Sequence, residues 1–333
     1  MIQNQRIEII DYIRGFAFIG ITFTNIFQNI SMVSTDANPS VSSFINTFMV
    51  SKFIYIFMFL LGLSSALLMS NLKRRGEKAN LIYIRRFSTL LLIGITCTFV
   101  GIPAGALFIM YAIYGLIGFI FQRMPPMINI VVFIAIAILT WFTRNMVLIE
   151  GESINNQVVS LVSMLSGFSM VILGIFLGQV SFFNHLQRCK GLLVTGVVLL
   201  FFLTYYSYDW MNNFNSLVMS LLYIVCFSIL SMNINVRRTF SFLIAFGRMS
   251  MSNFIVHTSF VYFYLENGKL SFLTYLGIGL FLIVLQIIYS NIWLKYFRMG
   301  PVEWIWRMGI YWKKIRIFGS VAKNSKFSEN KTC

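Results

Sequence analysis

Long apolar runs alternate with short polar segments from about residue 13 to about residue 292. Each run is close to the length of about twenty residues that an α-helix needs to cross about 30 Å of hydrocarbon at about 1.5 Å per residue. The pattern therefore predicts about ten membrane-spanning helices. The predicted spans cover approximately residues 13–31, 53–71, 87–103, 105–121, 127–143, 158–178, 191–208, 214–231, 243–263 and 271–292.

Composition excludes an ordinary soluble domain, because 58% of the residues are hydrophobic and 11% are charged. We expect an all-α fold, a polytopic integral membrane helical bundle over residues 1–294. An amphipathic interfacial helix is expected over 295–318, followed by a polar, basic and disordered tail over 319–333. The first apolar run is interpreted as a retained span, because Glu8 and Asp11 precede it and no small-residue cleavage site follows it.

The basic residues orient the predicted bundle. The chain carries 26 Lys and Arg against 10 Asp and Glu, a formal net charge of +16 at pH 7. With a cytoplasmic N-terminus, all but four of these cations lie on the cytoplasmic side, the exceptions being Lys52, Arg144, Arg248 and Lys269. Because cytoplasmic loops are enriched in Lys and Arg, we expect both termini in the cytoplasm and a multi-pass protein of the cell membrane. The charge then indicates contact with anionic lipid on the cytoplasmic side, and no nucleic acid partner.

The motifs of several soluble and metal-dependent enzymes are missing. The sequence contains no Walker loop, dinucleotide fingerprint, HExxH or nucleophile elbow, so no cofactor is evident. The cysteines have no metal-ligand or disulfide spacing, and no metal site is predicted. They are Cys97, Cys189, Cys226 and Cys333. Carboxylates are also missing from the middle of the predicted spans, which argues against a proton-coupled carrier.

A polar stripe runs along the first predicted span. Asp11 and Arg14 are three residues apart and can pair at the cytoplasmic interface. Asn25 follows Arg14 by eleven residues, about three helical turns, so the two side chains share one face. One interpretation is an interhelical hydrogen-bond strip, and the other is the polar wall of a substrate site, with Arg14 and Asp11 as ligand-binding residues.

The ninth predicted span contains a candidate general base, His257. The spacing of Asn253 and His257 places both on one helical face. An imidazole inside a membrane protein needs polar partners, so it faces the bundle or a wet cavity and can move a proton, or it is a packed structural histidine. Arg248 is expected near the cytoplasmic start of this span, where its guanidinium can bind an acidic group. His185, the other histidine, falls in a basic loop.

Two further stretches have structural interpretations. Gly174 and Gly178 form a GxxxG pattern that indicates close helix packing. Glu303 and Arg307 form an i, i+4 pair beside Trp304, on a basic amphipathic helix expected to lie in the cytoplasmic interface. The loop that ends at Arg85 and Arg86 indicates either topology and lipid contact or an anion site.

Six motifs resemble the YeiB family of bacterial membrane proteins. They are D-x-x-R-G-F-A-x-x-G-I-x-x-x-N (Asp11 to Asn25), K-F-x-x-x-F-x-F-L-x-G (Lys52 to Gly62), Arg85-Arg86, Y-A-x-x-G (Tyr111 to Gly115), G-R-M-x-x-x-N (Gly247 to Asn253) and G-P-x-E-W-x-W-R (Gly300 to Arg307). That family is distantly similar to membrane acyltransferases that move acetyl groups from a cytoplasmic thioester donor to sugars. The resemblance implies an acyl-thioester donor, with Tyr111 among the ligand-binding residues.

The sequence is compatible with three functions, and it does not decide whether the chain is an enzyme. The first is an acyltransferase-like membrane enzyme acting on a glycan, lipid or peptide, in which His257 is the base, Asn253 or Asn25 orients the acceptor, and the arginines hold the donor. The second is a non-catalytic accessory factor for peptide (bacteriocin or lantibiotic) export or self-protection, with an exporter or other membrane protein as partner. It is motivated by the absence of the acidic and histidine residues that family members commonly have, since Gly94 to Gly101 and Gly105 to Met110 contain neither. A small-molecule permease is the third.

Overall fold

The protein is described here from a computed structural model that covers residues 2–33, 46–150, 156–184, 186–206, 213–265 and 272–319. Within these ranges the secondary structure is helical, and the single β feature is an isolated antiparallel bridge between Phe297 and Phe318. The all-α prediction is confirmed for this part of the chain. The predicted disordered tail lies outside the described residues from 320 onward.

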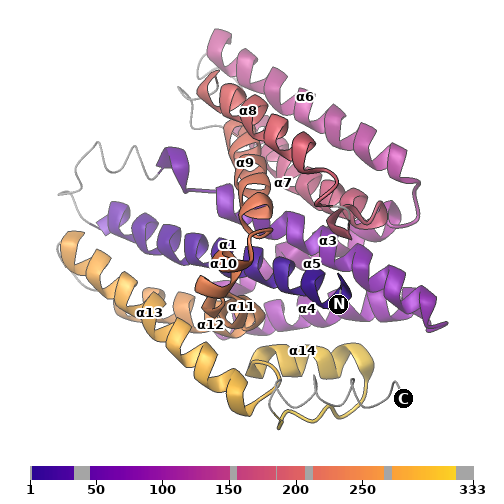
Figure 1. Ribbon diagram of the computed structural model, residues 1–333. Helices are drawn as coiled ribbons and strands as arrows, with labels where there is room; N and C mark the ends of the chain where they lie inside the picture. The colour runs from indigo at the N-terminus through magenta and orange to yellow at the C-terminus, as the bar shows by residue number, and fades with distance from the viewer. Residues whose placement is uncertain are drawn as a thin grey trace. The chain divides into compact units, whose positions relative to one another are not determined.

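Nine long helices form most of the described structure (Figure 1). They are α1 (Ile2–Val33), α3 (Lys52–Arg74), α4 (Ala79–Phe99), α5 (Ala104–Phe121), α6 (Pro126–Glu150), α7 (Asn156–Gln179), α8 (Lys190–Tyr206), α9 (Asn213–Leu230) and α13 (Phe272–Tyr296). The short helical segments are η2 (Phe182–Asn184), α10 (Ile234–Thr239), α11 (Phe242–Arg248), α12 (Ser250–Phe260), η3 (Val261–Leu265) and α14 (Pro301–Tyr311).

Seven described segments are long and apolar enough to cross a membrane. They are Ile9–Ile26, Asn46–Arg74, Ala79–Phe99, Ala104–Phe121, Pro126–Thr143, Ser160–Gln179 and Gly277–Tyr296. Two shorter apolar helices, Lys190–Tyr206 and Phe214–Leu230, coincide with the predicted spans 191–208 and 214–231. The chain is a multi-pass membrane protein.

The predicted ninth span, 243–263, is not one continuous helix. It consists of α11, a break at Met249 and then α12, and it ends in the π-helical segment η3. Met249 has φ −106° and ψ 23°, outside the α-helical region. The break directly follows Arg248, near which the sequence predicted the start of this span, and it exposes backbone N–H groups at the start of α12.

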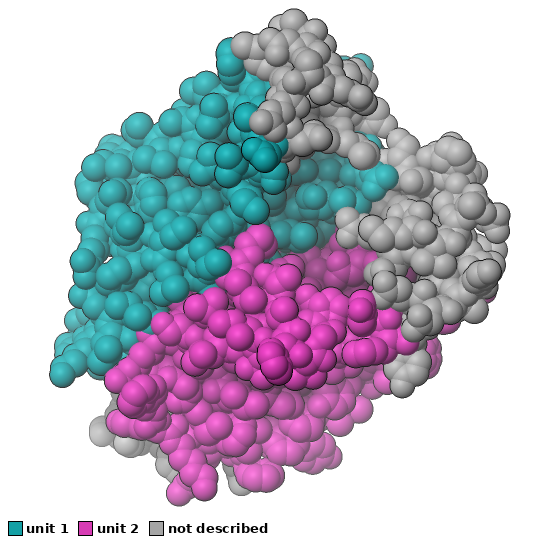
Figure 2. Space-filling view, turned by 180° about the vertical axis from the view of Figure 1, so that it is seen from behind, with its two compact units in different colours: residues 1–10, 38–84, 111–237 teal, residues 11–37, 85–110, 238–333 magenta. Residues whose placement is uncertain are grey.

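The chain divides into two compact units (Figure 2). Unit 1 comprises residues 1–10, 38–84 and 111–237, and unit 2 comprises residues 11–37, 85–110 and 238–333. Each unit has its own buried interior, and the two are described separately below.

Glycines bring α3 and α7 together in unit 1. A Cβ added to Gly62 would lie 2.0 Å from the carbonyl oxygen of Val171, and one added to Gly174 would lie 2.1 Å from that of Phe59. At Gly178 the added atom would lie 2.5 Å from Cβ of Ala66. These distances are too short for any side chain, so Gly174 and Gly178 allow backbone-to-backbone packing of the kind that small residues permit in membranes.

Neutral hydrogen bonds join the helices of unit 1. The Tyr55 hydroxyl and the Ser166 hydroxyl are 2.6 Å apart, and Gln122 donates its amide to the Ser65 hydroxyl at 2.9 Å. Buried polar groups with partners of this kind dock helices to one another where no water is available.

In unit 2, α1 and α11 meet through two glycines. A Cβ added to Gly15 would lie 2.1 Å from the carbonyl oxygen of Leu243, and one added to Gly247 would lie 2.3 Å from that of Asp11. Phe18 of α1 packs on Phe246 of α11, with ring centroids 4.7 Å apart. This contact fixes the first predicted site helix against the helix that ends at Arg248.

Candidate functional site

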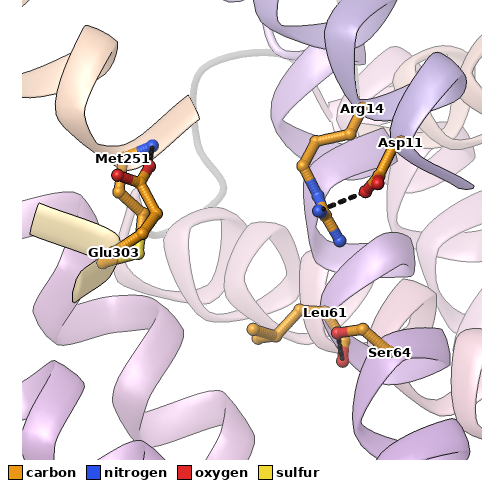
Figure 3. Close-up of polar contacts among 6 residues, drawn as sticks. All are labelled: Asp11, Arg14, Leu61, Ser64, Met251 and Glu303. Carbon is orange, nitrogen blue, oxygen red and sulfur yellow. Dashed lines mark hydrogen bonds and ion pairs between the residues drawn. The ribbon is translucent and has the colours of Figure 1, made fainter. Parts of the chain in front are cut away.

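A cluster of one acidic and several basic side chains lies around Asp11, where the part of α1 that belongs to unit 2 begins. Arg14 donates from Nη1 to Oδ1 of Asp11 at 2.9 Å, as Figure 3 shows. The two side chains are 25% and 14% exposed, so the pair is accessible from outside the unit. Asp11 also attracts Arg248 and Arg307 electrostatically. Asp11 is thus paired with Arg14 and influenced by two further guanidinium groups, so positive charge exceeds negative charge around it.

Arg248 connects this cluster to the C-terminal part of the chain. It is the last residue of α11, and its Nη2 donates to the carbonyl oxygen of Arg298 at 3.2 Å. A guanidinium has five N–H donors, so it retains donors for an anionic ligand after this bond. The structure thus brings together three of the predicted ligand-binding residues, Asp11, Arg14 and Arg248.

His257 lies in the interior of unit 2, on α12. Its side chain is fully buried, at 0% exposure. Within the described residues neither ring nitrogen meets the geometric criteria for a hydrogen bond, although the backbone of Thr22 on α1 interacts with the ring. Most buried polar atoms in proteins are hydrogen-bonded, so an imidazole with two unsatisfied nitrogens is unusual and is suited to receive a polar group.

Asn253 is held one turn before His257 by α13. Its side-chain amide donates to the Ser290 hydroxyl at 2.7 Å, and Gln286 donates to the Asn253 backbone carbonyl at 3.1 Å. All three side chains are buried, and no described residue hydrogen-bonds to Oε1 of Gln286. Asn253 is therefore a docking residue between α12 and α13 in this structure.

The cluster around Asp11 and the His257 imidazole lie at different levels of unit 2. Nine residues separate Arg248 from His257, and eleven separate Asp11 from Thr22. At about 1.5 Å per residue the two centres are about 14–17 Å apart along the helices. Asn25 is partly exposed and lies one turn beyond Thr22 on α1. The predicted residues thus form a surface level and a buried level rather than one compact site.

Glu303 of α14 binds the start of α12. Its Oε1 accepts the backbone N–H groups of Met251 at 2.8 Å and of Ser252 at 3.1 Å, the first of which is drawn in Figure 3. Its Oε2 accepts a hydrogen bond from the Ser252 hydroxyl. Burial raises the pKa of the Glu303 carboxyl, and the hydrogen bonds from Ser252 and Met251 oppose that shift. The predicted pairing of Glu303 with Arg307 is wrong, because the carboxylate points to α12 instead.

Arg85 and Arg86 contact the aromatic residues of the C-terminal region. The Arg85 guanidinium lies 4.3 Å from the ring centroid of Trp312, and that of Arg86 lies 5.1 Å from that of Trp306. Trp306 Nε1 also donates to the backbone carbonyl of Arg86 at 3.0 Å. These contacts place both arginines beside α14, as cation–π partners that hold α14 on α4.

The remaining predicted residues have structural surroundings. Trp304 donates from Nε1 to the carbonyl oxygen of Ile315 at 2.8 Å, which folds the segment after α14 back onto it. Tyr111 belongs to unit 1, where it is buried and its hydroxyl has no hydrogen-bond partner within the described ranges. Gly174 and Gly178 also belong to unit 1, in the contact with α3.

Sequence reasoning missed three residues of unit 2: Ser252, Gln286 and Ser290. Gln286 and Ser290 are polar residues four apart in the apolar run of α13, and this spacing places them on one helical face. Polar residues inside a membrane span usually face a partner, so the spacing could have identified them. In the described part of the chain no group of His, Cys, Asp or Glu could hold a metal ion.

Two protein families match this chain. The family described as heparan-alpha-glucosaminide N-acetyltransferase, catalytic, matches residues 6–207, and a family described as protein of unknown function (DUF418) matches residues 200–313. The predicted resemblance to YeiB-like proteins and to membrane acyltransferases is confirmed by these matches.

Two bacterial relatives match over nearly their whole length. The "uncharacterized 39.9 kDa protein in amylase 3'region" of Bacillus acidopullulyticus is 28% identical, over 94% of this chain and 96% of its own. The "uncharacterized protein YxaH" of Bacillus subtilis (strain 168) is 22% identical, over 94% of this chain and 97% of its own. No solved structure matches the chain.

Proposed function

We propose that this chain, which belongs to the family of heparan-alpha-glucosaminide N-acetyltransferase catalytic domains, transfers an acyl group from a thioester donor to a hydroxyl or amine acceptor. The observation that carries the proposal is the His257 imidazole, which is fully buried in a membrane protein and whose two nitrogens have no hydrogen-bond partner among the residues that the structure describes. A neutral imidazole in this condition is a general base whose proton-accepting nitrogen is not already engaged.

The proton and bond changes balance without another reactant. His257 removes the proton from the acceptor O–H or N–H as that atom bonds to the thioester carbonyl carbon. The C–S bond then breaks, and the leaving thiolate takes the proton from the imidazolium. His257 returns to its neutral form, and the products are an ester or amide and a thiol.

The arginine cluster supplies the donor site in this proposal. Arg14, Arg248 and Arg307 share the single Asp11 carboxylate, so the cluster attracts an anionic donor. The separation of about 14–17 Å between this cluster and His257 requires a donor whose thioester lies at the end of a long arm. Arg85 and Arg86, on α4 of the same unit, widen the basic surface around α14.

We further propose ten spans with both termini in the cytoplasm. The seven long apolar segments, the two shorter helices α8 and α9, and the broken α11–α12 pair would make ten. The excess of Lys and Arg on one side supports the orientation and a contact with anionic lipid. Fusions of a reporter that is active on only one side of the membrane, placed at each loop, test the orientation. With a cytoplasmic N-terminus, successive loops should alternate between outside and cytoplasm, and any other order would overturn the proposal.

The test of catalysis compares the two histidines of the sequence. We expect purified protein in lipid nanodiscs to transfer label from a radiolabelled acetyl thioester to a glycan, lipid or peptide acceptor. His257→Ala should lower the rate about 10²–10⁴-fold, the usual contribution of a general base. His185→Ala is the matched control, and its rate should stay near that of the wild type. Undiminished transfer by His257→Ala would exclude His257 as the base.

The complete burial of His257 supports a second candidate, a non-catalytic accessory factor for peptide export or self-protection. A buried histidine also packs helices together, and the chain lacks the acidic and histidine residues of the family pattern at 94–110. This candidate requires a membrane protein partner, such as an exporter. Co-purification of a stable partner without transfer by any donor would favour it, and transfer by the purified chain alone would exclude it.

A further inference from the structure

The start of α12 lacks a cap of its own. The break at Met249 removes the intrahelical partners of the next backbone N–H groups, as at any helix N-terminus. No side chain at the N-cap position accepts a hydrogen bond, and Met249 at ψ 23° is not in the extended conformation from which a cap residue reaches back. The donors of Met251 and Ser252 must therefore be satisfied from another helix.

Glu303 satisfies them from α14. One carboxylate oxygen accepts both backbone N–H groups, and the other accepts the Ser252 hydroxyl. The carboxylate also places negative charge at the positive end of the α12 dipole. Ser252 completes the contact in return, since its hydroxyl accepts the backbone N–H of Val302 at 3.1 Å.

The G-P-x-E segment is shaped around this contact. A Cβ added to Gly300 would lie 2.2 Å from Oε2 of Glu303 and 2.7 Å from the Ser252 hydroxyl oxygen, so a larger residue there would displace the carboxylate from Ser252. Pro301 begins α14 at the position where its missing N–H costs nothing. The spacing then sets Glu303 in the first turn of α14, facing α12.

Independent contacts hold α14 in place. Trp306 donates to the backbone of Arg86, and a Cβ added to Gly309 would lie 2.2 Å from the Thr89 methyl carbon. Glu303 therefore lies on a helix, α14, that α4 holds in place. It binds the start of α12, the helix that carries His257. His257 lies about one and a half helical turns beyond Ser252.

We propose that Glu303 is a positioning residue for His257, because it caps the broken helix α12 in trans and so sets the height and rotation of the imidazole. The inference rests on the proposed function, and it adds a role for the G-P-x-E-W-x-W-R motif. Loss of the cap lets the first turn of α12 unwind, and a shift of about 1 Å at a catalytic group can cost about 10²-fold in rate.

The test compares Glu303→Ala and Glu303→Gln with Glu77→Ala, a control at an exposed glutamate. Glu303→Ala should lower kcat about 10–10²-fold and change the KM for the donor less than about threefold. Glu303→Gln should be intermediate, because its amide oxygen still accepts the two N–H groups but carries no charge. Glu77→Ala should match the wild type in both constants.

A second measurement does not depend on catalysis. Hydrogen exchange of the peptide that covers residues 249–254 should be faster in Glu303→Ala than in the wild type and unchanged in Glu77→Ala. Unchanged exchange would overturn the trans cap, even if His257→Ala has no effect and the proposed function itself fails. Faster exchange with an unchanged kcat, in a protein that His257→Ala inactivates, would overturn the positioning role alone.

Discussion

The α3–α7 contact of unit 1 and the α12–α13–α14 contacts of unit 2 join helices in different ways. In unit 1, Gly62, Gly174 and Gly178 let two backbones touch, and neutral pairs such as Tyr55 with Ser166 add hydrogen bonds. In unit 2, a carboxylate caps a broken helix, and the buried His257 finds no hydrogen-bond partner in the described part of the chain.

The two regions show how a buried polar residue that packs helices differs from one that can take part in chemistry. A polar residue that has found its partner inside a bundle holds two helices together and has no capacity left for a ligand. A buried polar residue without a partner costs free energy, which natural proteins mainly tolerate where the group has a function. The α3–α7 contact, whose Tyr55 and Ser166 hydroxyls are paired, therefore serves as the reference against which changes around His257 can be interpreted.

The largest effect on stability is expected at Gly174. Its added Cβ would lie 2.1 Å from the Phe59 carbonyl oxygen, so Gly174→Ala must separate α3 from α7. We expect a loss of about 1–3 kcal/mol in the free energy of unfolding, the usual cost of overpacking. Gly196→Ala on α8 is the matched control, because no atom lies within 4 Å of its added Cβ. Denaturant unfolding in detergent measures both, and equal stability of the two variants would contradict the close contact.

The next largest effect on stability is expected when one buried interhelical hydrogen bond is removed from each unit. Tyr55→Phe and Asn253→Ala each remove one buried interhelical bond, and each should cost about 0.6–1.7 kcal/mol. Ser166 keeps a bond to the Ser163 carbonyl in the first variant, so Tyr55→Phe should be the milder change.

The rate of acyl transfer should differ between Tyr55→Phe and Asn253→Ala. Tyr55→Phe should leave the transfer rate within about twofold of the wild type, while Asn253→Ala should lower it about tenfold or more, because Asn253 docks the helix that carries His257. Rates are compared after normalisation to folded protein from size-exclusion chromatography. A greater loss in Tyr55→Phe would place the chemistry in unit 1.

The smallest effect on stability is expected at Asp11. The pair with Arg14 is partly exposed, so Asp11→Asn should change the free energy of unfolding by less than about 1 kcal/mol. The same substitution removes the one carboxylate that the three arginines share, and donor affinity should rise several-fold at low salt. Donor KM measured at low and high ionic strength checks this, and a weaker affinity at both would mean that the cluster binds no anion.

The sequence predicted the helical class, nearly all of the apolar segments and the family. From their spacing it also predicted that Asp11 pairs with Arg14 and that Gly174 and Gly178 allow close helix packing, and the structure contains both contacts. These features depend on helical periodicity and on the length of apolar runs, which are local properties of the chain.

The tertiary structure decided the features that depend on which helices meet. Arg248 marked the place where a helix was expected to start, but the sequence did not show how the break at Met249 is stabilised, because Glu303 lies more than fifty residues away. The same distant contact turned Glu303 from Arg307 toward α12, since two backbone N–H groups and a hydroxyl outcompete a surface ion pair. The sequence alone determined that this chain crosses a membrane as helices. Only the packing decided that His257 is buried, with no hydrogen-bond partner among the described residues, on a helix capped from another part of the chain.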